Sequence, residues 1–328
     1  MSGAGGGRLR AYAPIVAVVA LLALTPLATS ANTVLNGMVL ALIVALAGQG
    51  WNILGGYGGQ FSFGHAAFFG TGAYGTAILQ ARFGVNAYFA FASAVGAGAA
   101  AGAIIGSLSF RSGLRGSYFA LVTLAFAEVF RILANASPFA GGAAGTLLKL
   151  DARPENFQFA SRAVYFWIAL GLVALALVVT RALERSRFGA YLVAIRENEN
   201  AAKALGVDTL KVKLQAITLS AAITAAAGAF YAQYFLYVNA EIAYGAGVSV
   251  EALLAPIIGG LGTAFGPVIG ALALHGLAEG AKAATGRLPG FDVALYGALL
   301  ILAIAFAPKG LRGLAVRLGR GLALRAAS

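Results

Sequence analysis

Apolar residues follow one another along this chain in long runs, which short polar or glycine-rich segments separate. A run of about 20 apolar residues crosses a bilayer as an α-helix. The pattern therefore predicts an all-α polytopic membrane protein, with a single transmembrane domain over residues 1–328. We favour a retained first span over a cleaved signal peptide, because the first run reaches Thr33 with hardly a polar break. The expected spans are 12–31, 34–54, 65–81, 87–109, 117–134, 163–182, 213–237 and 292–307.

Basic residues are concentrated in four segments outside these runs, which orients the spans. Lys and Arg are retained on the cytoplasmic side of a membrane. We therefore expect the N- and C-termini in the cytoplasm, together with the turn 110–116, the segment 181–213 and the basic tail 308–328. The glycine-rich loop 135–162 and the segment 238–249 then lie on the periplasmic side.

The apolar stretch 250–278 cannot be a single crossing, because the basic tail would then lie outside. Its middle is rich in residues that break a helix, namely Gly259, Gly260, Gly262, Gly266 and Pro267. We expect a broken-helix hairpin, in which two short helices enter and leave on the same side and an irregular turn joins them. Irregular backbone at membrane depth is tolerated only against protein or a water-filled cavity.

The glycine-rich break at 257–265 has a counterpart earlier in the chain. "ILGGYGGQF" (53–61) and "IIGGLGTAF" (257–265) share Ile, Gly-Gly, Gly and Phe at the same offsets. Paired glycine-interrupted segments indicate a transport site, and the alternative is two unrelated helix-packing sites. We expect 55–64 to form a turn near the cytoplasmic side and His65 to start the next span, where it lines the path or supports helix packing. The candidate path-lining residues are Tyr57, Gln60, Ser62, His65, Gly259, Gly260 and Gly262.

Ionisable residues inside the predicted spans are few, and such residues are costly in a membrane unless they are paired. Glu128 and Arg131 lie three residues apart on one helix face, so we expect an ion pair with a structural role or a role in gating along the path. His275 and Glu279 lie four residues apart. We interpret them as a structural or interfacial pair, because no nucleophile lies nearby.

Composition excludes several classes of function. Hydrophobic residues make up 60% of the chain and charged residues 10%, so the net charge of +12 reflects topology rather than binding of nucleic acid. The chain has no cysteine and two distant histidines, which argues against disulfides and a metal enzyme. It also lacks the G-x-x-x-x-G-K-[ST] loop of an ATPase, and no catalytic triad or HExxH arrangement occurs within the spans.

The polar segment 185–211 is predicted to form a short cytoplasmic helix, placed to receive force from a soluble partner. Its residues 199–206, ENAAKALG, resemble the Glu-x-Ala-Ala-x-x-x-Gly signature of ABC importer permeases. In that superfamily the segment is a coupling helix that docks into the ATP-binding subunit. The resemblance implies a coupling role for Arg196, Glu197, Glu199, Ala201, Ala202 and Gly206.

Five motifs in order narrow the resemblance to the branched-chain amino acid permeases, in particular the LivM type, from about residue 33 onward. They are SFGHAAFFGTGAY (62–74), RGSYFALVTLAFAEVFRIL (115–133), RSRFGAYLVAIRENENAAKALGV (185–207), GGLGTAFGPVIGA (259–271) and PKGLRG (308–313). The resemblance implies the permease fold of an ABC importer in the bacterial inner membrane. It also implies a second permease subunit, two ATP-binding cassette subunits and a periplasmic binding protein. ATP and Mg²⁺ would bind the partner ATPase, and this chain would need no cofactor.

The implied substrates are Leu, Ile and Val, although relatives of this kind also carry urea, short amides or aromatic acids. Two departures from the family pattern leave the substrate open: Ser117 stands where an acidic residue is common, and GGAAG (141–145) replaces Gly-Gly-Pro-x-Gly. The competing classes are an ion-coupled secondary transporter and an intramembrane enzyme. For the secondary transporter only Glu128 is a candidate coupling residue, and the segment 185–211 would have no role.

Overall fold

The computed structural model describes residues 4–29 and 31–285, together with a few isolated positions between 291 and 311. The predicted span 292–307 and the basic tail 308–328 lie almost entirely outside the described residues. Within the described part, six helical stretches are long and apolar enough to cross a membrane. This confirms an all-α polytopic membrane protein. The six are Asn32–Tyr57, Ala87–Arg111, Gly116–Ala136, Arg162–Glu184, Thr209–Phe235 and Ala240–Gly259.

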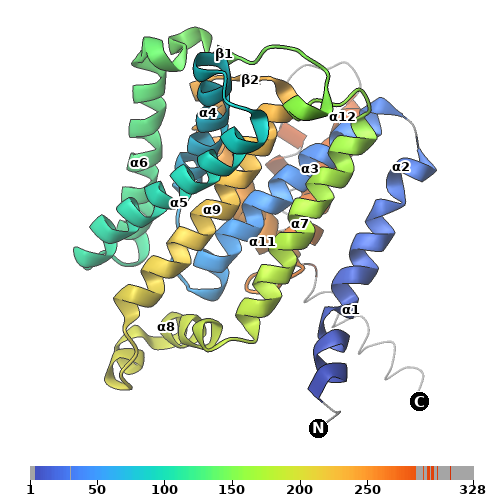
Figure 1. Cartoon of the computed structure of the whole chain (residues 1–328). Coiled ribbons are helices and arrows are strands. Elements are labelled where there is room, and N and C mark those ends of the chain that lie inside the picture. Colours follow the sequence, from blue (N-terminus) through green and yellow to red (C-terminus); the bar gives the residue numbers. More distant parts are fainter. Residues whose placement is uncertain are drawn as a thin grey trace, which may run out of the picture.

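The elements run in the following order along the chain (Figure 1). The helices are α1 (Ala4–Ala23), α2 (Thr25–Ala28), α3 (Asn32–Trp51) with its π-helical extension η1 (Asn52–Tyr57), α4 (His65–Phe83), α5 (Ala87–Arg111), α6 (Gly116–Ala136), α7 (Arg162–Glu184), α8 (Arg187–Ala204), α9 (Thr209–Phe235), α10 (Ala240–Ala243), α11 (Ala246–Gly259) and α12 (Gly266–Thr285). Short 3₁₀ turns η2 (Pro138–Ala140), η3 (Gly142–Ala144) and η4 (Pro154–Asn156) lie between α6 and α7. Two antiparallel two-residue strands, β1 (Thr146–Leu147) and β2 (Tyr237–Val238), pair in the same region.

Helix α9 forms the centre of the bundle, and small residues let its neighbours approach closely. Gly72 of α4 and Gly98 of α5 both lie against Ala225, and Gly228 lies against the backbone of Phe69. A Cβ atom added at Gly72, Gly98 or Gly228 would lie 2.0, 2.2 or 1.9 Å from the nearest atom of the neighbouring helix, which is closer than two such atoms can approach. Such small-residue contacts are the usual basis of helix packing in membranes, where burial of apolar surface gives little driving force.

The first predicted span differs from the structure. The sequence predicts one helix over 12–31, whereas α1 ends at Ala23 and the single turn α2 follows after Leu24. Pro26 in the first turn of α2 explains the interruption, because proline has no backbone N–H to continue the helix and restricts the residue before it. Ile15 of α1 is buried and the Trp167 indole N–H of α7 donates to the Ala23 carbonyl, so α1 packs along α7.

The end of the second span also differs. The sequence predicts a turn from residue 55, but the helix continues through Tyr57 as the π-helical segment η1. Gly55 lies beneath the Trp51 ring and Gly56 lies against the Asn52 side chain, so these two glycines serve close packing within the helix. The irregular turn is therefore shorter than predicted and covers 58–64.

The predicted hairpin with a break at its glycines is present, but its arms are longer than the two short helices expected. The stretch Ala240–Gly259 is by itself long enough to cross a membrane, and the turn lies at the end of the bundle beside η1 rather than in the middle of the membrane. Helices α11 and α12 are joined by 260–265, where Gly260 and Gly262 have φ angles of 136° and 66° that favour glycine. The turn lies beside Asn52 of η1, while His275 of α12 lies against Gly37 near the start of α3. Helix α12 thus runs back along α3, and the hairpin returns to the end of the bundle from which it entered.

The two ends of the bundle carry different structures (Figure 1). Helix α8 lies crosswise at one end, where α1 also begins, and we call this the α8 end. The strands β1 and β2 lie at the opposite end, which we call the loop end. This arrangement agrees with the prediction that 185–211 and the N-terminus share one side and that 135–162 lies on the other.

Candidate functional site

The two glycine-rich segments singled out in the sequence meet in space at the α8 end. The Asn52 side chain donates to the Thr263 carbonyl (3.0 Å) and accepts from the Gly262 N–H (2.9 Å). A Cβ on Gly56 would lie 2.8 Å from the Gly262 nitrogen, so the two backbones touch. The predicted correspondence between 53–61 and 257–265 is therefore a direct contact in the fold.

Two buried amides, which sequence reasoning missed, hold this junction together. The Gln49 amide donates to the Ala264 carbonyl (2.6 Å), and both Gln49 and Asn52 are fully buried. Backbone groups of an irregular turn must be satisfied inside a membrane protein, and these side chains supply the partners that the broken helix lacks. Their signal in the sequence was the occurrence of two polar residues in one turn of an otherwise apolar span.

Arg196 of α8 connects this junction to the crosswise helix. Its guanidinium donates from Nη1 to the Gly56 carbonyl (3.0 Å), and the same Nη1 lies 3.2 Å from where a Cβ on Gly262 would be. The aliphatic part of Arg196 packs on Gly59, which has a φ of 67°. Arg196 also pairs with its neighbour Glu197, whose side chain is largely exposed. One side chain is therefore hydrogen-bonded to the first glycine segment and lies next to the second.

Glu199 is turned toward the interior of the protein. Its carboxylate pairs with Lys213 of α9 (3.0 Å), Arg115 before α6 (3.3 Å) and Lys203 (3.4 Å). The side chains of Glu199 and Lys213 are only 11% and 5% exposed. Burial alone would raise the pKa of Glu199, but Lys213, with Arg115 and Lys203, outweighs burial and holds that pKa below its ordinary value. The cluster fastens α8 to the start of α9 and to the turn before α6.

Helix α8 has a kink that defines a short second segment. Asn198 has extended backbone angles (φ −159°, ψ 102°), and its side chain accepts from the Ala201 N–H (3.0 Å). Asn198 therefore acts as an N-cap for the turn that holds the Glu-x-Ala-Ala signature. The predicted helix end at Gly206 is confirmed, because α8 stops at Ala204 and Gly206 has a φ of 85°.

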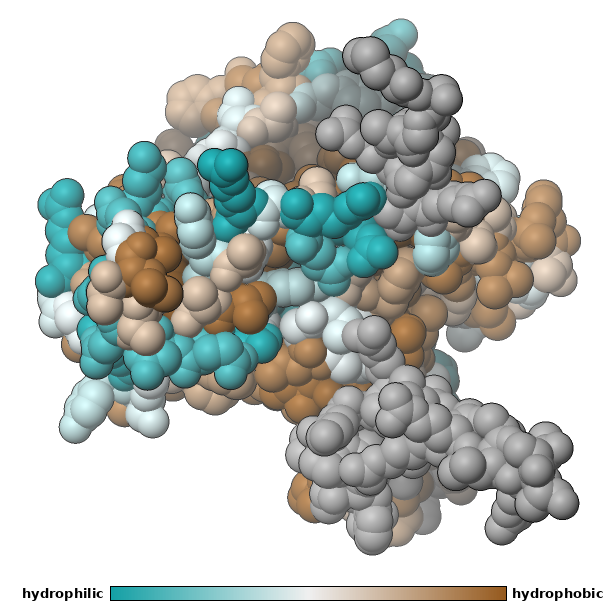
Figure 2. Space-filling view, turned by 90° about the horizontal axis from the view of Figure 1, so that it is seen from below, coloured by the Kyte–Doolittle hydropathy of each residue, from teal (hydrophilic) through white to brown (hydrophobic). Residues whose placement is uncertain are grey.

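The signature residues divide between the interior and the surface. Ala202 is buried, whereas Ala201, Leu205 and Gly206 are exposed, with Leu205 85% exposed. A Cβ on Gly206 would meet nothing within 4 Å. Figure 2 shows that hydrophilic residues gather over the α8 end of the bundle, on the side where α8 lies.

The polar residues of the predicted path turn are enclosed by contacts. His65 is fully buried between Ser62 (Nδ1 to Oγ, 3.2 Å) and Ser220 of α9 (Nε2 to Oγ, 2.8 Å). The Tyr57 hydroxyl donates to Glu184 (2.6 Å), and Gln60 donates to the Gly58 carbonyl (3.1 Å). Tyr57, Ser62 and His65 thus connect η1 and the turn with α4, α7 and α9, as the helix-packing interpretation of His65 predicts.

The remaining glycine candidates have structural positions. Gly259 lies against the backbone of Gly266 and Gly270, where no side chain would fit, so it closes the hairpin. Gly260 and Gly262 supply the left-handed angles of the turn. These contacts close the hairpin, and the hydrogen bonds of Asn52 attach its turn to η1.

The predicted ion pair of Glu128 and Arg131 is present, and it has a third member. Arg131 Nε donates to Glu128 (2.9 Å), and Arg131 also pairs with Glu241 of α10. The arginine thus joins α6 to the entrance of the hairpin. Glu241 lies 110 residues from Arg131, so spacing along one helix could not predict this partner. Glu279 pairs with Lys282 (2.8 Å) within α12.

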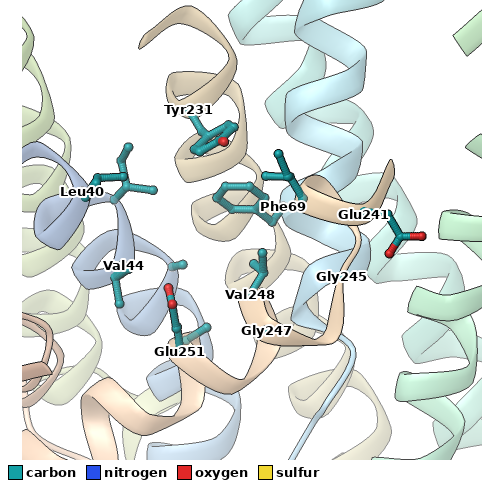
Figure 3. Close-up of a pocket in the computed structure, with 13 residues that line it drawn as sticks. Leu40, Val44, Phe69, Tyr231, Glu241, Gly245, Gly247, Val248 and Glu251 are labelled. Atoms are coloured by element: carbon teal, nitrogen blue, oxygen red, sulfur yellow. The ribbon is translucent and has the colours of Figure 1, made fainter. Parts of the chain in front are cut away.

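A cavity of about 270 Å³ lies between α3, α4, α9 and the start of the hairpin. Glu251 of α11 lines it among mostly apolar side chains, and Glu241 of α10 is a second carboxylate in the lining (Figure 3). Glu251 is exposed in the isolated chain, so the cavity is open on that side. Sequence reasoning passed over Glu251, although a single acid within the apolar stretch 246–259 was a visible signal.

Comparison with known proteins gives the family. Residues 33–304 match the family described as branched-chain amino acid transport system / permease component. The chain is 30% identical to the high-affinity branched-chain amino acid transport system permease protein LivM of Escherichia coli, over 90% of this chain and 74% of that protein. It is 27% identical to LivH of Escherichia coli and to BraD of Pseudomonas aeruginosa, each over 85% of this chain and 94% of the relative. No solved structure matches. The chain therefore belongs to the branched-chain amino acid transport system permease family.

Proposed function

We propose that this chain forms part of the translocation path of an ABC importer for Leu, Ile and Val. A periplasmic binding protein delivers the amino acid, and hydrolysis of ATP with Mg²⁺ on a partner subunit drives uptake. The observation that carries the proposal is the position of Arg196, which donates to Gly56 of the first glycine segment and lies next to Gly262 of the second. Through Arg196 a crosswise surface helix reaches the end of α3 and the turn of the hairpin.

The residues of α8 and of the turn after it have two different roles in coupling. Ala201, Leu205 and Gly206, with Glu197 beside them, are exposed and form the surface on which the ATP-binding subunit docks. Glu199 and Ala202 point inward and hold the docked segment on α9 and the turn before α6. Arg196 passes the movement on to η1 and the hairpin. Such a movement changes access to the path only if the ATP-bound partner prefers one conformation of the permease.

The assembly follows from the same proposal. The relatives include two differently named permease proteins of Escherichia coli, LivM and LivH, so a heterodimer of permeases is expected. Two ATP-binding cassette subunits and one binding protein complete it. The chain lies in the inner membrane with both termini and α8 in the cytoplasm, the loop end in the periplasm, and eight spans besides the hairpin.

Uptake by cells that lack their own branched-chain transporters tests the function. Cells that receive this chain with its permease partner, ATP-binding subunits and binding protein should accumulate labelled leucine, and not labelled urea or benzoate. Omission of the ATP-binding subunits should abolish uptake. Full uptake without them would instead favour an ion-coupled secondary transporter, and uptake of urea or benzoate alone would reassign the substrate.

A further inference from the structure

The cavity of about 270 Å³ has a mostly apolar wall to which α3, α4, α9, α10 and α11 contribute. Figure 3 shows Leu40 and Val44 of α3, Phe69 of α4 and Val248 of α11 around it, with the Glu251 carboxylate directed into the space. Ligand pockets typically measure about 300–1,000 Å³ for drug-sized molecules and combine apolar walls with a few polar groups. This cavity lies just below that range and suits a small molecule.

Glu251 lies near the middle of the membrane. Its neighbour across the cavity, Val44, is the thirteenth residue of the 26-residue helical stretch Asn32–Tyr57. At about 1.5 Å per residue, Val44 is about 18 Å from the start of that stretch. The hydrocarbon core of a bilayer is about 30 Å thick, so the cavity is far from both surfaces.

Within the residues that the structure describes, Glu251 is the α-helical glutamate that forms no ion pair with Arg or Lys. His275 of α12 lines a second, smaller cavity of about 110 Å³ together with it. In the described part of the chain, each other glutamate of an α-helix pairs with Arg or Lys, namely Glu128, Glu184, Glu197, Glu199, Glu241 and Glu279. None of the residues that line the cavity is basic. A carboxylate in the membrane is costly unless a positive charge meets it, and unpaired ionisable residues there mark substrate pathways.

We propose that Glu251 binds the α-ammonium group of the transported amino acid, while the apolar wall holds its aliphatic side chain. This inference rests on the proposed function and names the recognition that takes place within the membrane. The first turn of α11 lines the same cavity at Gly247 and Val248. Free N–H groups at a helix start attract anions. The Val248 N–H already donates to the Gly245 carbonyl, so the N–H groups before it in this turn are the ones that would meet the substrate carboxylate. The broken start of α11 thus completes a site for a zwitterion.

The same chemistry rejects the other substrates known among such transporters. Benzoate has no cation, and its carboxylate would meet the negative charge of Glu251. Urea is neutral and has no apolar part to fill the wall of Leu40, Val44 and Phe69. The site therefore favours a zwitterion with an aliphatic side chain.

Charge removal at Glu251 tests the site in proteoliposomes that hold the complete transporter, with leucine-loaded binding protein and ATP. Glu251→Gln should lower leucine uptake about tenfold or more, as expected for the loss of a charge-assisted hydrogen bond. Glu251→Asp should retain a substantial part of the uptake. Wild-type uptake in the same vesicles tests the proposed function separately. Wild-type rates in Glu251→Gln would overturn the inference and leave the proposed function standing.

Cysteine labelling gives a second measurement that needs no transport by the variant. The chain has no cysteine, so a single introduced thiol reports one position of this subunit. Val248 lines the cavity, whereas Val250, two residues further on the same helix, is exposed and does not line it. Leucine should slow maleimide labelling of Val248→Cys and leave Val250→Cys unaffected. The protection should disappear in Val248→Cys combined with Glu251→Gln.

Two results would contradict the site directly. Equal labelling of Val248→Cys with and without leucine would show that the amino acid does not occupy the cavity. Loss of the second permease subunit on purification of Glu251→Gln, with leucine protection unchanged, would show that Glu251 pairs with a basic residue of that subunit. Either result would overturn the role of Glu251 in substrate binding.

Discussion

The buried pair of Glu199 and Lys213 provides a sharp test of how α8 is held. Replacement of Lys213 by methionine keeps the length of the side chain and removes the ammonium 3.0 Å from the carboxylate. Removal of one partner from a buried pair costs about 3–5 kcal/mol, because the other charge stays buried. Here Arg115 and Lys203 remain at 3.3 and 3.4 Å, and both are about half exposed. We therefore expect a loss of about 2–3 kcal/mol, below the full cost.

Thermal unfolding of the purified complex and the ratio of leucine transported to ATP hydrolysed measure this loss. Lys213→Met should lower the unfolding midpoint and the transport ratio together, because α8 is then held less firmly on α9. Lys211→Met is the matched control, since Lys211 lies two residues away on the exposed side of the same turn. The double variant Lys213→Met with Glu199→Gln should recover part of the stability, because no buried charge is then left unpaired.

The opposite pattern would refute this reasoning. If Glu199 acted by touching the ATP-binding subunit, Glu199→Gln would lower coupling while Lys213→Met left it intact. Unchanged stability in Lys213→Met would show that the pair does not hold α8. The same conclusion would follow if the two substitutions lowered the stability of the double variant additively.

Three further predictions follow from the contacts at the α8 end and in the core. Arg196→Lys should lower leucine transported per ATP several-fold, because a lysine cannot keep the guanidinium contact with Gly56 and the adjacent hairpin turn. Gly72→Ala should destabilise the complex by about 1–3 kcal/mol through overlap with Ala225, whereas Gly171→Ala, with open space around it, should be neutral or stabilising in the same thermal assay. The lowered pKa of Glu199 means that its contribution to stability is present above its ordinary value of 4.5 and is lost as the pH falls through the lower folded value. A pH titration of unfolding should show this loss in the wild type and not in Glu199→Gln.

The sequence predicted the features that depend on local backbone chemistry. Glycines and a proline in the middle of 250–278 indicated a broken hairpin, and Gly206 indicated the end of α8. Both are confirmed because Gly262 and Gly206 have left-handed angles that other residues avoid. The pairing of Glu128 with Arg131 followed in the same way from their spacing on one helix.

The main error was the prediction of a turn from residue 55. Glycine occurs both in turns and at close helix contacts, and the sequence alone does not distinguish the two. Gly55 and Gly56 lie inside the helical segment η1. Glycine is needed at both positions because the Trp51 ring and the Asn52 side chain occupy the space that a larger side chain would take. Close packing of this kind depends on partners fixed by the tertiary fold. The same holds for Gln49 with Ala264 and for Arg131 with Glu241, whose partners lie 215 and 110 residues away.

The positions of the contacts suggest how force on α8 reaches a substrate inside the membrane. Arg196 donates to Gly56 and lies next to the hairpin turn, and each of these lies on a continuous helical segment that leads to the cavity. Val44 is twelve residues from Gly56 along α3 and η1, about 18 Å, and Glu251 is eight residues from Gly259 along α11, about 12 Å. Because the buried amides of Gln49 and Asn52 bind the two segments together, a displacement of Arg196 would act on both at once. The same walls are also fastened to their neighbours, since the Ser249 hydroxyl of α11 accepts from the Ala66 N–H of α4 (2.8 Å) and Gly50 of α3 lies against Ser220 and Thr224 of α9. Opening of the cavity on the side of Phe69 and Tyr231 would therefore require these contacts with α4 and α9 to change.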